Sequence, residues 1–250
     1  MTKKVDAIIQ ARLGSSRFPR KVLTEINGKK LIEHVIIGLK ASPMVDRIII
    51  ATTDRPQDQE LVEFCEKSRI PYFRGDCDDV LMRFIGAAEV FQCDKIIRVC
   101  SDNPFIDLKS LNQLLDIFLS DPNLDYCTHV TADGVPIILN SLGLFVEAVS
   151  IKALKKIVEM TQEKKYLEHV TMFIYRHPDF FNIATIPLSD SINANYRFTV
   201  DYKEDFIHCE KIMNSLSDYS MNSIFDLMKR DDTLSEKILN FSKKHLKHYA

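Results

Sequence analysis

A short segment near the start of the sequence concentrates basic residues. The stretch AIIQARLGSSRFPRKVL, which begins at Ala7, carries Arg12, Arg17, Arg20 and Lys21 in a chain whose net charge is only −2. Arginine offers a planar fork of donors that suits phosphate oxygens, and lysine adds a compact charge. This pattern favours a binding site for a strongly anionic group, although an ordinary solvated basic turn would have the same composition.

Small residues lie between these basic side chains. Gly14, Ser15 and Ser16 allow backbone amides to turn inward and allow a phosphate to approach closely. The segment contains neither GxxxxGKS nor GxxxxGKT, and Gly14 stands alone rather than in a GxGxxG pattern. We therefore predict a polyphosphate site that differs from both common phosphate-binding loops.

Two aspartates could hold a cation at such a site. Asp102 lies in RVCSDNPFID and Asp201 lies in RFTVDYKEDF, each directly after an apolar run. A carboxylate facing a polyphosphate requires a cation between them, and Mg²⁺ is commonly held by one or two carboxylates together with phosphate oxygens. Both residues also have plainer interpretations, Asp102 as part of a polar turn and Asp201 as a helix cap paired with Glu204. Their spacing in the sequence does not establish that they meet.

Alternating strands and helices would position these groups. Apolar, β-branched runs predict strands at 5–10, 46–53, 71–75 and 94–100, and helical spacing predicts helices at 30–42, 58–68, 78–91 and 110–120. Continuously apolar strands separated by single helices indicate a doubly wound, mostly parallel α/β sheet. Ligands bind such sheets at the carboxyl ends of the strands, which is where the basic loop and Asp102 lie.

The second half of the chain is less regular. From about residue 121 it reads as strands and turns, followed by helices at 151–161 and 165–177 and a strand near 180–187. A strand at 197–201 should lead into a helix, and two further helical stretches end the chain. We expect a single domain over 1–250, in which a subregion at about 121–190 serves as a flap over the acceptor or as a dimerisation arm.

Composition excludes several classes of protein. The near-neutral charge argues against general nucleic-acid binding, and no apolar run approaches the roughly 18–20 residues that span a bilayer. Charged and polar residues interrupt any signal-peptide core at the N-terminus. The six cysteines form no CxxC pair, which indicates reduced thiols and a cytoplasmic protein rather than a zinc site.

The ordered motifs resemble those of a known family. The segments IIQARLGSSRFPRKVL, VDRIIIATTD, FRGDCDDVLMRF, RVCSDNPFID, EHVT and RFTVDYKEDF are similar to those of spore-coat-polysaccharide-type cytidylyltransferases. These enzymes are relatives of the acylneuraminate and 3-deoxy-manno-octulosonate cytidylyltransferases. The resemblance covers roughly residues 5–212. It implies the nucleotide-diphospho-sugar transferase fold, and a reaction of CTP with an acidic or phosphorylated sugar that gives an activated sugar and pyrophosphate.

The resemblance also implies roles for individual residues. Arg12, Lys21 and Asp102 match catalytic positions, and Asp102 and Asp201 match carboxylates that bind Mg²⁺. The implied nucleotide-binding residues are Ala11, Arg12, Gly14, Ser15, Arg17, Lys21, Arg74, Asp79 and Arg83. The implied acceptor-binding residues are Asn103, Glu147, Glu168 and His169. A homodimer is implied too, with its contact expected at 121–161.

Three departures from the family pattern bear on the site. Arg20 stands where the family usually has glycine, LEHVTMF stands in place of REHVTPY, and Phe145 replaces the aspartate of GLDVE. The last two changes lie where the acceptor is expected, so the acceptor is the least determined part of the reaction.

The expected chemistry is attack by an acceptor oxygen on the α-phosphorus of CTP, in line with departing pyrophosphate. Such reactions require positioning and charge neutralisation. Arg12, Arg17 and Lys21 would hold the β- and γ-phosphates. Two alternatives stay open, an enzyme that uses UTP, GTP or ATP on a sugar 1-phosphate, and a silent nucleotide-binding protein. Retention of both Asp102 and Asp201 argues against the second.

Overall fold

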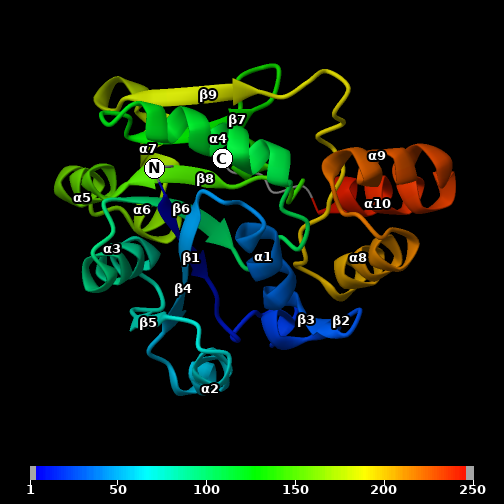
Figure 1. The fold of residues 1–250 in the computed structure, drawn as a ribbon, viewed down its shortest axis with the longest axis horizontal. Helices are drawn as coiled ribbons and strands as arrows, with labels where there is room; N and C mark the ends of the chain where they lie inside the picture. The colour runs from blue at the N-terminus through cyan, green and yellow to red at the C-terminus, as the bar shows by residue number, and fades with distance from the viewer. Residues whose placement is uncertain (1–3, 246–250) are drawn as a thin grey trace.

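The computed structural model describes residues 4–245, which form a central sheet covered by helices (Figure 1). The seven strands are β1 (Val5–Gln10), β4 (Val45–Thr53), β5 (Tyr72–Gly75), β6 (Lys95–Cys100), β7 (Tyr126–Val130), β8 (Glu147–Ser150) and β9 (Ile183–Pro187). A small antiparallel pair is formed by β2 (Glu25–Ile26) and β3 (Lys29–Lys30). The helices in the first half are α1 (Leu31–Lys40), α2 (Gln59–Lys67), α3 (Val80–Phe91) and α4 (Leu108–Ser120). Those in the second half are α5 (Ile151–Met160), α6 (Lys164–Glu168), α7 (Met172–Arg176), α8 (Lys203–Ser215), α9 (Met221–Arg230) and α10 (Asp232–Lys244).

The order of strands across the sheet is β5-β4-β1-β6-β8-β7-β9. The first four strands in this order are parallel to one another, as the sequence predicts, and β7 is parallel to β9. Only β8 runs against both of its neighbours. Its first residue, Glu147, therefore lies beside Arg98 near the edge where β1 and β6 end. The region at 121–190 thus contributes three strands to the sheet.

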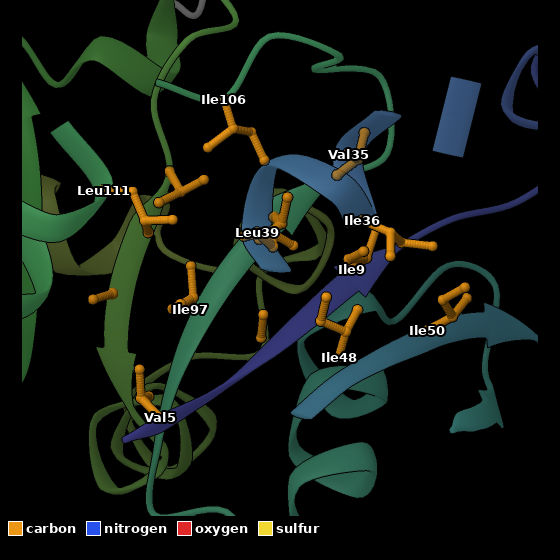
Figure 2. Packing of buried hydrophobic residues seen from close by; sticks show 14 of the residues in the cluster. Val5, Ile9, Val35, Ile36, Leu39, Ile48, Ile50, Ile97, Ile106 and Leu111 are labelled. Carbon is orange, nitrogen blue, oxygen red and sulfur yellow. The ribbon is translucent and has the colours of Figure 1, made fainter. Parts of the chain in front are cut away.

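Alternation along the central strands separates two apolar cores. Ile9 of β1 and Ile97 of β6 pack with α1, α2 and α4 on one face, shown from close by in Figure 2. Ile8 of β1 and Ile96 of β6 point to the other face, where α3, α5, α6 and α7 cover them. Because side chains alternate along a strand, a strand that is apolar at every position must be covered on both faces.

A third apolar core joins the C-terminal helices to the rest of the molecule. Residues of α8, α9 and α10 pack with Ile26 of β2 and with Phe105, which follows β6. In Figure 1 these helices, coloured orange to red, lie together at one side of the molecule, away from β5 and α2. No helix among residues 4–245 combines the length and the apolar character needed to cross a membrane.

Two sequence-based expectations in the second half are wrong. No strand forms at 197–201, because the backbone of Phe198 and Val200 bonds to the loop residues Ser141 and Asp102 instead of to a strand. The helix expected at 165–177 is broken into α6 and α7. His169 lies at this break, so it is not an interior helix residue.

Candidate active site

The basic loop begins directly after β1 and is held in shape by a buried carboxylate. The backbone N–H of Leu13 donates to Oδ1 of Asp58 at 2.6 Å, and the hydroxyl of Thr53 donates to the other carboxylate oxygen. Asp58 is fully buried and precedes α2, yet its side chain makes no cap bond to that helix. The sequence signal for Asp58 was that of an ordinary helix start, so its role in the loop was not predicted.

Arg20 occupies a backbone conformation that suits glycine. Its φ is 60° and its ψ is 15°, which is the left-handed region. Its backbone N–H donates to the carbonyl of Leu13 at 3.0 Å, which closes the loop before the short 3-10 helix Lys21–Leu23. This turn explains why a glycine is expected at this position. The Arg20 side chain points away to pair with the exposed Glu60 at 2.6 Å.

Lys21 brings the two predicted metal ligands together. Its Nζ lies 3.0 Å from Oδ2 of Asp102, 3.1 Å from Oδ1 of Asp201 and 2.7 Å from the carbonyl oxygen of Val200. Lys21 is 8% exposed. Burial alone would lower the pKa of Lys21, but the charges of Asp102 and Asp201 outweigh it, and the pKa is raised.

Further cations surround Asp201. Arg197 donates from Nη2 to Oδ2 of Asp201 at 2.9 Å and from Nε to Asp205 at 2.8 Å, and all three side chains are buried. Arg17 approaches from the solvent side, with its Nη2 at 3.3 Å from Oδ1 of Asp201. The carboxylate of Asp205 also accepts the backbone N–H groups of Asp201 and Tyr202, so it fixes the turn that leads into α8. Sequence reasoning missed Arg197 and Asp205 because their partners are set by this turn.

Arg17, Lys21 and the two aspartates Asp102 and Asp201 line a cavity of about 310 Å³ at the carboxyl ends of β1 and β6. Twelve of the predicted site residues contribute to its wall: Ala11, Arg12, Ser15, Arg17, Lys21, Arg83, Asp102, Asn103, Glu147, Glu168, His169 and Asp201. The cavity thus has a basic side at the loop after β1. The lining also includes the 3-10 helix Ile137–Leu139, Phe145 and residues at the break between α6 and α7.

Three predicted nucleotide-binding residues do not belong to the described lining. The guanidinium of Arg74 bonds to the carbonyl oxygens of Thr53 and Arg55. Asp79 caps α3 by accepting the N–H of Met82 at 2.8 Å, which is the plain structural role expected of a residue before a helix. At Gly14, an added Cβ would meet the side chain of Gln57.

Arg83 is a buried cation in the cavity wall. It is 4% exposed, and Nη1 donates to the carbonyl oxygens of Asp76 and Cys77 at 2.7 and 3.4 Å. Its Nε has no partner, and no ion pair joins Arg83 to a carboxylate within residues 4–245. Burial lowers the pKa of Arg83 and the Arg12 guanidinium adds to this effect, against weaker opposing effects of Cys77, Asp58 and Asp76. A buried cation that forms no ion pair with a carboxylate indicates an anionic ligand at this wall.

Arg98 and Glu147 form a buried ion pair in the lining of the cavity. Nη1 of Arg98 lies 2.7 Å from Oε2 of Glu147, and Nη2 donates to Gln10 at 3.1 Å. Glu147 is 1% exposed and also accepts the hydroxyls of Tyr126 and Thr171. The charge of the Glu147 carboxylate is therefore balanced by Arg98.

Four buried polar atoms of residues that line the cavity have no hydrogen-bond partner. These atoms are Arg83 Nε, Arg98 Nε, Asn103 Oδ1 and Thr199 Oγ1. Native proteins rarely bury polar groups without hydrogen-bond partners. We therefore expect a bound ligand to supply hydrogen-bond partners for these atoms.

Asp102 and Asp201 fit a divalent cation. Their carboxylate oxygens already converge on one positive atom, Lys21 Nζ, and carboxylates are the ligands that Mg²⁺ prefers. In the described part of the chain no three His, Cys, Asp or Glu side chains are grouped as a complete metal cage. A cation here would therefore draw its remaining ligands from water or from a bound phosphate.

Comparisons with known proteins agree with this geometry. The cytidylyltransferase family model matches residues 7–238. The spore coat polysaccharide biosynthesis protein SpsF of Bacillus subtilis is 32% identical over 243 residues, covering 92% of this chain and 96% of that protein.

Two solved structures show the same fold. A cytidylyltransferase from Leptospira borgpetersenii has a TM-score of 0.82 and 24% identity, covering 95% of this chain and 98% of that one. CMP:2-keto-3-deoxy-manno-octonic acid synthetase complexed with CTP has a TM-score of 0.64 and 19% identity, covering 85% and 99%. The family match spans nearly the whole chain and includes the loop after β1, Asp102 and Asp201, so this protein belongs to the cytidylyltransferase family.

Proposed function

We propose that this enzyme transfers CMP from CTP to an oxygen of an acidic or phosphorylated sugar, with release of pyrophosphate, in surface polysaccharide synthesis. One observation carries the proposal: a basic loop and two convergent aspartates share one cavity at the carboxyl edge of the sheet. SpsF is named as a polysaccharide biosynthesis protein, and one structure with this fold holds CTP, which supports both the pathway and the nucleotide.

The nucleotide phosphates bind on the basic side of the cavity. Arg12 is exposed, and Arg17 is 45% exposed at its side chain, so both can reach the β- and γ-phosphates without unfolding the loop. Arg83 supplies a buried guanidinium without a carboxylate partner at the same wall. These cations neutralise the charge that develops as pyrophosphate departs.

Asp102 and Asp201 are the residues that hold Mg²⁺. When bound, the ion supplies Lewis-acid activation of the α-phosphate. Arg197 orients Asp201 through its 2.9 Å ion pair, and Asp205 holds Arg197 in place from the other side. The chain itself thus contributes binding, orientation and charge, and it requires no protein nucleophile.

The acceptor binds against lining residues outside the basic loop. Glu168, His169 and Asn103 offer polar contacts to it, and Phe145, which stands where the GLDVE motif has aspartate, adds an apolar ring. Glu147 acts through Arg98, because its carboxylate is already paired at 2.7 Å. Two further proposals rest on the sequence: a homodimer with its contact at 121–161, from the family resemblance, and a cytoplasmic location, from the scattered cysteines and the interrupted apolar run at the N-terminus.

Pyrophosphate release tests the proposal. The protein is incubated with Mg²⁺, each of the four nucleoside triphosphates and a panel of acidic and phosphorylated sugars. We expect release with CTP and one class of acceptor. Equal or greater pyrophosphate release with UTP, GTP or ATP would contradict the choice of CTP as the donor. Binding of CTP without release across the panel would indicate a silent nucleotide-binding protein.

A further inference from the structure

The ammonium of Lys21 occupies the point where the two metal-binding carboxylates converge. It is surrounded by Asp102, Asp201 and the carbonyl oxygen of Val200, all within 3.1 Å, and its side chain is 10% exposed. These contacts are those of a cation site that is already filled by the chain itself.

The charges around this point are balanced. Ion pairs within residues 4–245 join three cationic side chains to three carboxylates at this point: Lys21, Arg17 and Arg197 with Asp102, Asp201 and Asp205. A free divalent cation would therefore meet no surplus of negative charge. It would also have to approach a buried ammonium, and repulsion between like charges is strong where water is excluded.

A nucleotide changes this balance because it brings its own negative charge. Lys21 and the phosphate-binding candidates Arg12 and Arg17 line the same cavity, so phosphates bound there would offer the ammonium a new anionic partner. The two aspartates would then lose the ammonium that lies between them and become available to a metal ion, while Asp201 would keep its ion pair with Arg197.

We infer that the Lys21 ammonium occupies the metal position in the free protein, so that Asp102 and Asp201 hold a metal ion only when nucleotide is bound as well. This inference rests on the proposed function, because it takes Asp102 and Asp201 as the metal ligands. It predicts an obligatory dependence: the aspartates do not bind a divalent ion tightly until nucleotide phosphates have drawn Lys21 away.

Binding of Mn²⁺ in the absence of nucleotide tests the inference. Free Mn²⁺ is measured by electron paramagnetic resonance with the wild type, Lys21→Gln and Lys21→Arg. Glutamine keeps a neutral hydrogen-bond donor but removes the charge, so Lys21→Gln should bind Mn²⁺ about tenfold or more tightly than the wild type. Lys21→Arg keeps the charge and should bind Mn²⁺ as weakly as the wild type.

Two controls assign the gain to this site. Adding Asp102→Asn to Lys21→Gln should abolish the gain, because the site loses one of its two carboxylates. Arg17→Gln should change Mn²⁺ affinity less than Lys21→Gln does, since the Arg17 side chain is 45% exposed and forms its ion pair with Asp201. Equal Mn²⁺ affinity for the wild type and Lys21→Gln would overturn the inference. Tight binding of Mn²⁺ by the wild type in the absence of nucleotide would also overturn it.

Crystals of the wild type provide a second measurement if Lys21→Gln does not fold. After a soak in Mn²⁺ alone, anomalous density should be missing between Asp102 and Asp201, and it should be present there after a soak in Mn²⁺ with CTP. Density at the aspartates without nucleotide would contradict the inference. Neither metal experiment measures turnover, so its outcome is separate from a failure to release pyrophosphate, which bears on the proposed function.

Discussion

Lys21 and Asp201 are separated by 180 positions in the sequence, and their side chains form a buried ion pair at 3.1 Å. The pair joins the loop after β1 to the turn before α8. The active site therefore depends on the C-terminal helices as well as on the sheet, because those helices pack against the segment that carries Asp201.

Removal of the Asp102 charge should stop transfer while leaving the nucleotide bound. Asp102→Asn keeps the size of the side chain but removes the carboxylate, and kcat should fall about a hundredfold or more. CTP should still bind, because the arginines of the loop remain. Asp226→Asn, at a side chain that is 69% exposed, is the matched control and should keep full activity. Near-normal kcat in Asp102→Asn would remove this residue from the metal site.

Arg83 should contribute to the binding of phosphate rather than of the base. Arg83→Met removes the buried guanidinium, and the affinity for CTP should fall about tenfold, as expected for loss of a charged hydrogen bond. The affinity for cytidine should not change, because cytidine carries no phosphate. Calorimetric titration of both ligands measures the difference, with Arg230→Met on α9 as an exposed control. An equal loss for cytidine would show that Arg83 supports the fold or the base instead.

The backbone at Arg20 should favour glycine over alanine. Both Arg20→Gly and Arg20→Ala lose the exposed ion pair with Glu60, but only alanine keeps a Cβ in the left-handed conformation. We expect Arg20→Gly to be more stable than Arg20→Ala by about 1 kcal/mol in urea unfolding. If the two variants unfold at the same urea concentration, the left-handed turn is not formed in solution.

His129 should make the protein sensitive to acid. Burial lowers its pKa to about 4, against a smaller opposing effect of Asp107, and neither ring nitrogen has a hydrogen-bond partner. Below pH 6.5 the unfolded chain takes up a proton that the native protein refuses until near pH 4, so stability is lost as the pH falls through this window. Between pH 7 and pH 5 the loss from His129 should be about 2 kcal/mol.

His129→Phe is the variant that isolates this effect. Phenylalanine keeps an aromatic ring against Phe145, whose centroid lies 4.7 Å from that of His129, but it cannot take up a proton. The free energy of unfolding of this variant should fall less between pH 7 and pH 5 than that of the wild type. Equal losses in the two proteins would mean that His129 titrates normally in the folded state.

The sequence predicted the parts of the site that follow directly from local pattern. Apolar runs and helical spacing located β1 and β6, and the carboxyl ends of parallel strands placed the basic loop and Asp102 at one edge. This part of the fold is confirmed. Local pattern was sufficient here because each strand is covered on both faces and each loop follows its strand directly.

The remaining features arise from contacts between distant segments. The ion pair of Arg197 with Asp205 and the absence of a strand at 197–201 depend on a turn whose partners lie near residues 102 and 141. The break at His169 places Thr171 where its hydroxyl reaches the buried Glu147. Neither feature has a periodic signal, since the groups that stabilise it come from other elements.

The fate of labelled phosphorus shows which part of CTP is transferred to the sugar. The enzyme is incubated with Mg²⁺ and the sugar that supports pyrophosphate release, once with CTP labelled at the α-phosphorus and once with CTP labelled at the γ-phosphorus. If CMP is transferred, the α label appears in the sugar product and the γ label in pyrophosphate. Recovery of the γ label in the sugar, or as free inorganic phosphate before any pyrophosphatase is added, would contradict it.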